Sequence, residues 1–183
     1  YENPKKRAED LHEQFLDKNV KAVIAIIGGS ESIRVLPYLD MNLIKNNFKF
    51  FMGYSDIVTF NTYFNINGLV TFNGPTVMAG FAESKELEED FVEYINNFLF
   101  KDWSEFKYKK FKRYTNKYLD WSDIKNLDKE NTNYIKNNDN WHFISGNKTV
   151  EGELFGGCIE VLEFMKSTPF WPIPPAEMKK VRD

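Results

Sequence analysis

The feature that most constrains the fold is an apolar run that ends abruptly at Gly28 and Gly29. The run over residues 21–27 is rich in β-branched residues and has no polar alternation, which is typical of a parallel strand buried on both faces. Two glycines directly after it permit a turn that a Cβ atom would obstruct. We therefore predict a buried strand, a sharp turn and then a new helical segment.

Ser32 stands where the chain enters that helical segment. A strand, a sharp turn, an exposed hydroxyl and a helix together form a nucleophile elbow, in which the first free N–H groups of the helix can stabilise an oxyanion. Because Pro37 is awkward inside a helix, we predict a single turn over residues 32–36. From the pattern alone two other interpretations stay open. Ser32 can cap the helix, or the turn can bind a phosphate, although the Glu31 carboxylate would repel one.

Strands and helices alternate through the first part of the chain. We predict helices over residues 5–18 and 56–65, and strands over residues 21–27, 48–52 and 69–72. This alternation predicts an α/β fold with a mainly parallel sheet and flanking helices. Sites in such sheets form at the carboxyl ends of the strands. We therefore expect the turns that begin at Gly28, Gly53 and Asn73 to share one rim.

The composition changes in the second half of the chain. An amphipathic helix is predicted over residues 84–100. From 101 to 140 there is no glycine or proline and aromatic residues alternate with lysines, which we interpret as a partly helical flap insert. Residues 141–145 and 150–155 predict a hairpin. A helix through residue 166 and a proline-rich connector over 170–175 follow.

The predicted organisation has three parts: an α/β nucleophile-bearing region (1–100), the flap insert (101–149) and the start of a smaller, β-containing C-terminal domain (150–183). The chain opens on Tyr1 rather than on a methionine, and its last residues form no closing element. We therefore expect it to be a piece of a longer protein.

Charge and composition exclude several classes of partner. A net charge of −3 favours neither a nucleic acid nor a membrane surface. Cys158 is the single cysteine, so no internal disulfide can form. No pair of histidines, cysteines or clustered carboxylates has ligand spacing, and we expect no metal and no cofactor. The apolar runs are too short for a membrane span and no signal peptide is visible, so we expect a cytoplasmic protein.

Four motifs occur in order along the chain: GGSESIRVLPYLD from Gly28, GYSDIVTFNTYF from Gly53, GLVTFNGP from Gly68 and EGELFGGCIEVLEFM from Glu151. This succession resembles the LD-carboxypeptidase family of serine peptidases, and in particular its microcin C7 self-immunity branch. The family's nucleophile is the serine of a Gly-Gly-x-x-Ser motif, and that position is Ser32 here. The resemblance implies a Ser-Glu-His triad whose glutamate and histidine lie beyond residue 183.

The resemblance also implies a set of substrate-binding residues. We expect main-chain N–H groups near Gly29 and Ile33 to hold the oxyanion. The candidate substrate-binding residues are Gly28, Ser55, Asp56, Trp103, Trp121, Gly156 and Gly157. Asp56 can instead cap the helix that it begins, and either tryptophan can simply pack in a core. The family more often has Gly-Gly-Asn where this chain has Cys158, which leaves a side-chain contact at that position open.

Two further features favour structural roles. His142 lies between aromatic residues in a predicted strand, and we interpret it as structural rather than as a general base. The lysines over residues 107–113 are interleaved with aromatic residues, a pattern also found in nucleic-acid binders. The spacing of Tyr108, Phe111, Tyr114 and Tyr118 instead predicts one face of a helix with the lysines solvated.

The implied function is hydrolysis of an amide near the C-terminal end of a short peptide. The flap insert favours a peptidyl-nucleotide over a murein peptide as the substrate. Without a base, the Ser32 hydroxyl is too weak a nucleophile at neutral pH, so we expect residues 1–183 alone not to turn over substrate. The alternatives are a murein tetrapeptide LD-carboxypeptidase, a non-catalytic ligand-binding α/β domain, and a fragment with no function of its own. A homodimer is left open.

Overall fold

The computed structural model describes residues 2–83, 88–102, 105–126, 129–130, 132–142, 144, 149 and 151–171. The chain divides into two compact units, each defined by the contacts among its own residues. Unit 1 comprises Tyr1–Ala79 and Glu153–Asp183, and unit 2 comprises Gly80–Gly152. The three-part division into 1–100, 101–149 and 150–183 stays a prediction.

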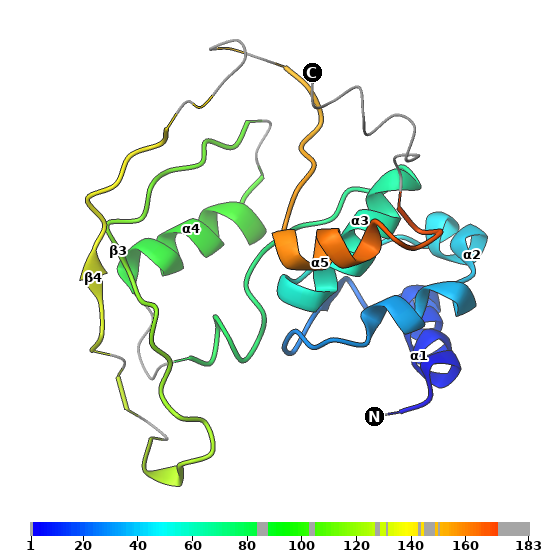
Figure 1. The fold of residues 1–183 in the computed structure, drawn as a ribbon, viewed down its shortest axis with the longest axis horizontal. Helices are drawn as coiled ribbons and strands as arrows, with labels where there is room; N and C mark the ends of the chain where they lie inside the picture. The colour runs from blue at the N-terminus through cyan, green and yellow to red at the C-terminus, as the bar shows by residue number, and fades with distance from the viewer. Residues whose placement is uncertain are drawn as a thin grey trace. The chain divides into compact units, whose positions relative to one another are not determined.

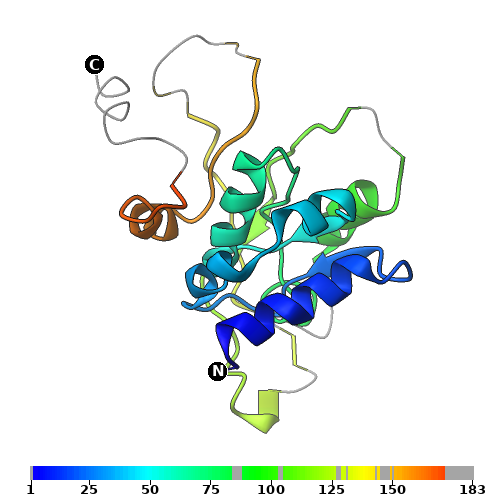
Figure 2. The same cartoon turned by 90° about the vertical axis from the view of Figure 1, so that its right-hand side faces the viewer.

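Unit 1 contains most of the regular structure. Its helices are α1 (Pro4–Leu16), α2 (Met41–Asn46), α3 (Val58–Ile66) and α5 (Ile159–Met165), with short 3₁₀ helices at Ser32–Arg34, Leu36–Tyr38 and Ser55–Ile57 (Figures 1 and 2). α1 begins with the Asn3 side chain as its cap and Pro4 in its first turn. The first 3₁₀ helix ends at Arg34 and the second begins at Leu36, so the break predicted near Pro37 is confirmed, although the turn is shorter than the predicted range of 32–36.

A small parallel sheet lies in unit 1. β1 (Ala22–Ile24) and β2 (Phe50–Met52) pair in parallel, with Val23 opposite Phe51. Phe72 adds only one parallel bridge, to Met52, where a strand over 69–72 was expected. The predicted parallel pairing is therefore confirmed, although the strands are shorter than predicted.

The expectation that the first strand is buried on both faces is wrong. Ile26 and Ile27 are 66% and 42% exposed. They are exposed because β1 ends at Ile24 and both side chains belong to the turn that follows the strand.

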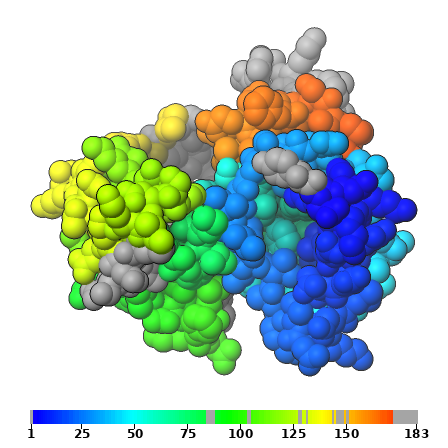
Figure 3. Space-filling model, turned by 90° about the horizontal axis from the view of Figure 1, so that it is seen from below, coloured from blue at the N-terminus to red at the C-terminus, as the bar shows by residue number. Residues whose placement is uncertain are grey.

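An aromatic core joins the helices of unit 1 to the sheet. Phe15 of α1, Phe51 of β2 and Phe64 of α3 are all buried. Phe64 meets Phe15 and Phe51 edge to face, with ring centroids 6.1 and 5.1 Å apart. Such pairs contribute about 0.5–1.5 kcal/mol beyond the area that they bury. The outer face of α1 forms part of the surface (dark blue in Figure 3). This core fixes the end of β2, from which the turn at Gly53 begins.

Unit 2 is built on helix α4 (Glu89–Leu99) and on two short antiparallel strands, β3 (Arg113–Tyr114) and β4 (Ile135–Lys136). The predicted helix over 84–100 is confirmed from Glu89 onward, and residues 84–87 lie outside the described part. A further 3₁₀ helix occurs at Ile124–Asn126.

The prediction that Tyr108, Phe111, Tyr114 and Tyr118 lie on one helical face is wrong, because the chain around them is extended or in a strand. The backbone of Lys112 shows why. Its N–H donates to Asp90 Oδ2 at 3.0 Å, and its carbonyl accepts from the Asn137 N–H at 2.8 Å. Partners outside the segment therefore replace the hydrogen bonds that a helix would have made.

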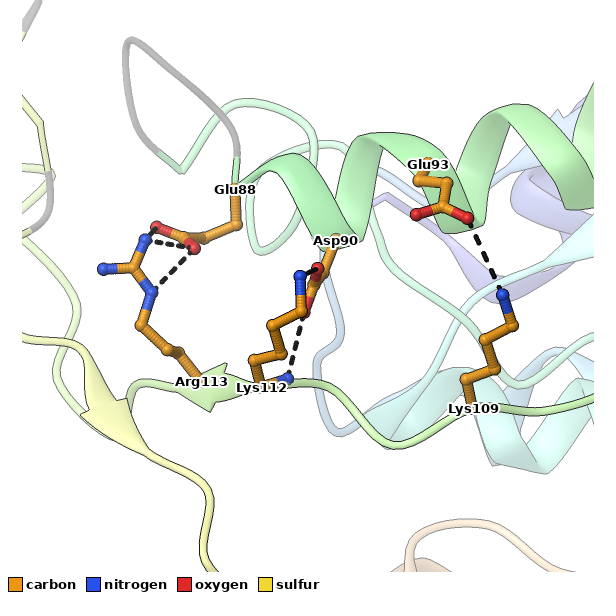
Figure 4. A network of polar contacts seen from close by, with 6 residues as sticks. All are labelled: Glu88, Asp90, Glu93, Lys109, Lys112 and Arg113. Atoms are coloured by element: carbon orange, nitrogen blue, oxygen red, sulfur yellow. Dashed lines mark hydrogen bonds and ion pairs between the residues drawn. The ribbon is translucent and has the colours of Figure 1, made fainter.

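Ion pairs hold this extended segment against α4 (Figure 4). Arg113 contacts both carboxylate oxygens of Glu88, and Lys112 Nζ lies 2.8 Å from Asp90 Oδ1. A longer pair of 3.7 Å joins Lys109 to Glu93. The hydrogen bond from the Lys112 side chain lowers the pKa of Asp90, and the backbone bond from Lys112 acts in the same direction.

Towards the C-terminus the predictions are met in part. The turn of the hairpin expected over 141–155 lies outside the described residues, and residues 151–155 form no strand. The helix expected before residue 166 is confirmed as α5, which packs against α3 (Figure 1). Within the described part of the chain, no helix is both long and apolar enough to cross a membrane.

Candidate active site

Two turns at the carboxyl ends of β1 and β2 lie in direct contact. A Cβ atom at Gly28 would lie 2.8 Å from Ser55 Cβ and 2.9 Å from Ser55 Oγ, closer than real Cβ atoms approach. A Cβ atom at Gly29 would lie 3.3 Å from Asp56 Oδ2. Neither glycine has a φ in the left-handed region. The close approach of the second turn therefore requires a glycine at position 28 and favours one at position 29. The prediction that a Cβ atom would obstruct this turn is confirmed.

Asp56 joins the two turns. Its Oδ2 accepts hydrogen bonds from the N–H of Glu31 at 3.0 Å, from the N–H of Ser32 at 3.0 Å and from the Ser32 hydroxyl at 2.7 Å. Both Asp56 and Ser32 are buried. The alternative that Asp56 caps the helix that it begins is wrong, because neither the 3₁₀ helix Ser55–Ile57 nor α3 has a side-chain cap. Asp56 instead binds the start of the helical turn at Ser32.

The expected exposure of the Ser32 hydroxyl is not observed. The strand, the turn and the start of a helical turn at Ser32 occur in the predicted order. However, Ser32 is only 1% exposed. It is buried because its hydroxyl points to the Asp56 carboxylate rather than to solvent.

Ser55 carries backbone strain next to this contact. Its φ is 59°, in the left-handed region that residues with a Cβ seldom adopt. Such a conformation costs about 1–2 kcal/mol and persists only where the surrounding structure holds it. The side chain of Ser55 packs over Gly28 while the next residue, Asp56, points at Ser32. The strained residue is thus the one that aims the carboxylate.

The N–H groups near Ser32 divide into two sets. Those of Glu31 and Ser32 itself are engaged by Asp56. Those of Gly29 and Ile33 donate to no acceptor among the described residues. The two oxyanion donors expected from the sequence are therefore available, and their role stays a prediction. The Glu31 side chain pairs with Arg34, at 2.7 Å between Oε2 and Nη1.

The loop before α5 brings a second glycine pair to unit 1. Gly157 has a φ of +148°, and a Cβ there would lie 2.7 Å from Val58 Cγ2 at the start of α3. Gly156 has no atom within 4 Å of the equivalent position. Cys158 donates to the Glu160 carboxylate at 3.2 Å. Among the described residues, no group of three or more histidine, cysteine or acidic side chains could hold a metal ion.

The two candidate substrate-binding tryptophans are Trp103 and Trp121. Trp103 lies outside the described residues. Trp121 belongs to unit 2, is 46% exposed and packs against Tyr118 with ring centroids 5.8 Å apart. Trp141, also in unit 2, is exposed and helps to line a cavity of about 320 Å³ together with Tyr94, Tyr108 and Phe111. His142 is exposed as well, and lies in no strand.

The sequence therefore identified Gly28, Gly29, Ser32, Ser55 and Asp56, and the structure brings them together in unit 1. The expectation that the turns beginning at Gly28 and Gly53 share one rim is confirmed. What the sequence did not show is that the Asp56 carboxylate binds Ser32.

Residues 1–74 match the family model of the LD-carboxypeptidase N-terminal domain. YocD of Bacillus subtilis (strain 168), which is named as a carboxypeptidase, is 34% identical over 168 residues, which cover 91% of this chain and 48% of YocD. The microcin C7 self-immunity protein MccF of Escherichia coli is 26% identical over 170 residues, which cover 92% of this chain and 48% of MccF. The chain thus spans about half the length of these curated relatives.

Solved structures agree with these matches. MccF in complex with aspartyl sulfamoyl adenosine has a TM-score of 0.80 and 26% identity, over 94% of this chain and 50% of that one. The MccF-like protein from Bacillus anthracis str. Ames has a TM-score of 0.57 and 35% identity, over 74% of this chain and 39% of that one. The α/β fold, with its helices and small parallel sheet, is therefore that of MccF.

Proposed function

Because residues 1–74 match the N-terminal domain of the LD-carboxypeptidase family, we propose that the chain belongs to this family and that the full-length protein is a serine peptidase with Ser32 as its nucleophile. The observation that carries the proposal is the position of Ser32 at the start of a helical turn after β1, inside the matched domain. The unengaged N–H groups of Gly29 and Ile33, on either side of Ser32, support it.

In the proposed reaction the Ser32 oxygen attacks an amide carbonyl of the substrate. The hydroxyl proton passes to a histidine oriented by a glutamate, and we propose that both lie beyond residue 183. The N–H groups of Gly29 and Ile33 donate to the oxyanion, and each such donor typically contributes about 3 kcal/mol. The C–N bond then breaks as the histidine protonates the leaving amine. Water finally hydrolyses the ester on Ser32.

For the substrate we propose a peptidyl-nucleotide cut at its amide. MccF, whose structure contains aspartyl sulfamoyl adenosine, supports this class. The exposed ring of Trp121, one of the two candidate tryptophans, could stack on the base. A murein peptide losing a terminal D-amino acid is the second candidate, favoured by the match of residues 1–74 to the general LD-carboxypeptidase model.

Both parts of the proposal can be tested on the full-length protein. We expect a fluorophosphonate probe to label Ser32, and Ser32→Ala to abolish both labelling and hydrolysis. Incubation with an aminoacyl sulfamoyl adenosine and, separately, with a murein tetrapeptide distinguishes the substrates, and we expect faster cleavage of the first. A protein that binds either compound but neither cleaves it nor reacts with the probe would be a non-catalytic binding domain.

A further inference from the structure

We propose that Asp56 is the positioning residue of the Ser32 nucleophile, an inference that rests on the proposed function. Ser32 opens a 3₁₀ helix of only 3 residues. Helices this short have poor hydrogen-bond geometry and do not fix their own orientation. The position of Ser32 therefore depends on contacts from outside the turn, and the Asp56 carboxylate supplies them.

The contacts are specific to one atom. Three donors converge on Asp56 Oδ2 at 2.7–3.0 Å, two of them backbone N–H groups and the third the Ser32 hydroxyl. Hydrogen bonds to an ionised carboxylate are about twice as strong as bonds between neutral groups. Asp56 lies 24 residues from Ser32 in sequence, so these bonds fasten the turn after β1 to the turn after β2.

The residues around Asp56 allow the turn after β2 to lie close to the turn after β1. Gly28 and Gly29 present no Cβ to the second turn, and Ser55 holds a left-handed backbone immediately before Asp56. Strained residues persist where the structure around them over-determines their conformation, and they cluster at functional sites.

In the proposed reaction, one of the three hydrogen bonds to Asp56 breaks and the other two can persist. The Ser32 hydroxyl must turn from Asp56 to the general base before it can attack. The N–H groups of Glu31 and Ser32 can stay bound to Asp56 throughout, because they take no part in proton transfer. Asp56 thereby holds the backbone at Ser32 while the side chain turns. Since these two N–H groups are occupied, oxyanion binding is left to Gly29 and Ile33.

Substitutions at Asp56 in the full-length protein test the inference. Asp56→Asn keeps an acceptor oxygen but loses the charge, and we expect kcat to fall about 3- to 10-fold. Asp56→Ala removes the contact, and we expect a fall of about 100-fold, the usual effect of a misplaced reacting group. KM is expected to stay within about twofold, because under this inference Asp56 contacts Ser32 rather than the substrate. The rate of fluorophosphonate labelling at Ser32 should fall with kcat.

Asp40 offers a matched control. Its carboxylate also accepts two backbone N–H groups, those of Asn42 and Leu43 at the start of α2, but it makes no contact with Ser32. We expect Asp40→Ala to lower the thermal midpoint while leaving kcat and the labelling rate within about twofold of the wild type. A loss of stability alone would therefore not reproduce the effect of Asp56→Ala.

The outcomes separate this inference from the proposed function. Asp56→Ala should also accelerate amide hydrogen exchange at Glu31 and Ser32 but not at Asn42 and Leu43. A folded Asp56→Ala protein with wild-type kcat and labelling rate overturns the inference and leaves the peptidase intact. If Asp56→Ala does not fold, an unchanged kcat in Asp56→Asn overturns it. A wild-type protein that neither cleaves nor reacts with the probe overturns the proposed function itself.

Discussion

At the scale of single residues, Gly28 is constrained by its neighbour Ser55 rather than by its own backbone. We expect Gly28→Ala to destabilise the protein by about 1–3 kcal/mol, because the new methyl group must displace the second turn. Urea denaturation measures the change. Gly152→Ala is the matched control, since no atom lies within 4 Å of that Cβ position and its φ is not left-handed. Equal stability of the two variants would show that the turns can separate without cost.

The limits of sequence reasoning are visible at Asp56. Its position after a strand and before a helix predicted a local cap, and local patterns favour local partners. Its partners are backbone N–H groups 24 and 25 residues away. Which carboxylate meets which N–H group depends on two strands lying side by side, and hydrophobic periodicity carries no such information. Ser32 was identified because a motif, rather than a contact, marks it.

At the scale of elements, the expectation for residues 107–118 failed for a related reason. The spacing of the aromatic side chains matches a helix, but it also suits an extended segment that packs onto another helix. Tyr94 of α4 contacts Phe106 and Phe111, with ring centroids 5.2 and 5.3 Å apart. These tertiary contacts override the local preference. By contrast, α4 itself was predicted because its amphipathic pattern is long and continuous.

The contact between Asp90 and Lys112 should depend on pH. The pKa of Asp90 is lowered below 3.8 by hydrogen bonds from Lys112, so its stabilising contribution is fully present above that ordinary value. The contribution is lost as the pH falls through the lowered pKa of the folded state. We expect the Lys112 amide to lose protection in that range, as measured by NMR. In Asp90→Asn the Lys112 amide should be weakly protected at every pH. Protection of this amide in the wild type that does not change with pH would contradict the assignment.

Tyr94, which also lies in α4, is a second group with a shifted pKa. Burial raises its pKa to about 12, and Tyr108 adds to the effect. Ionisation of this phenol is therefore disfavoured in the folded state, and we expect Tyr94 to titrate near pH 12. Ultraviolet absorbance between pH 9 and about 12 follows the titration. Tyr94→Phe should remove the part of the absorbance change that occurs near pH 12. If that part persists in the variant, the assignment to Tyr94 is refuted.

At the scale of the whole molecule, the chain covers 48% of MccF. We propose that the glutamate and the histidine of the triad lie beyond residue 183. We expect residues 1–183, produced alone, to hydrolyse neither candidate substrate faster than their Ser32→Ala form. General acid–base catalysis contributes about 10²- to 10⁴-fold, and under the proposal its base lies outside this part of the protein. Turnover is measured with the full-length protein as the positive control. Hydrolysis by residues 1–183 that depends on Ser32 would place the base within them.

A single carboxylate oxygen fastens two turns that are well separated along the chain. Substitutions near Gly53 would therefore lower the reactivity of Ser32, although the substituted residues need not contact the substrate. Genetic screens for inactive alleles should recover substitutions in both turns as one phenotypic class, and second-site suppressors of one turn should map to the other.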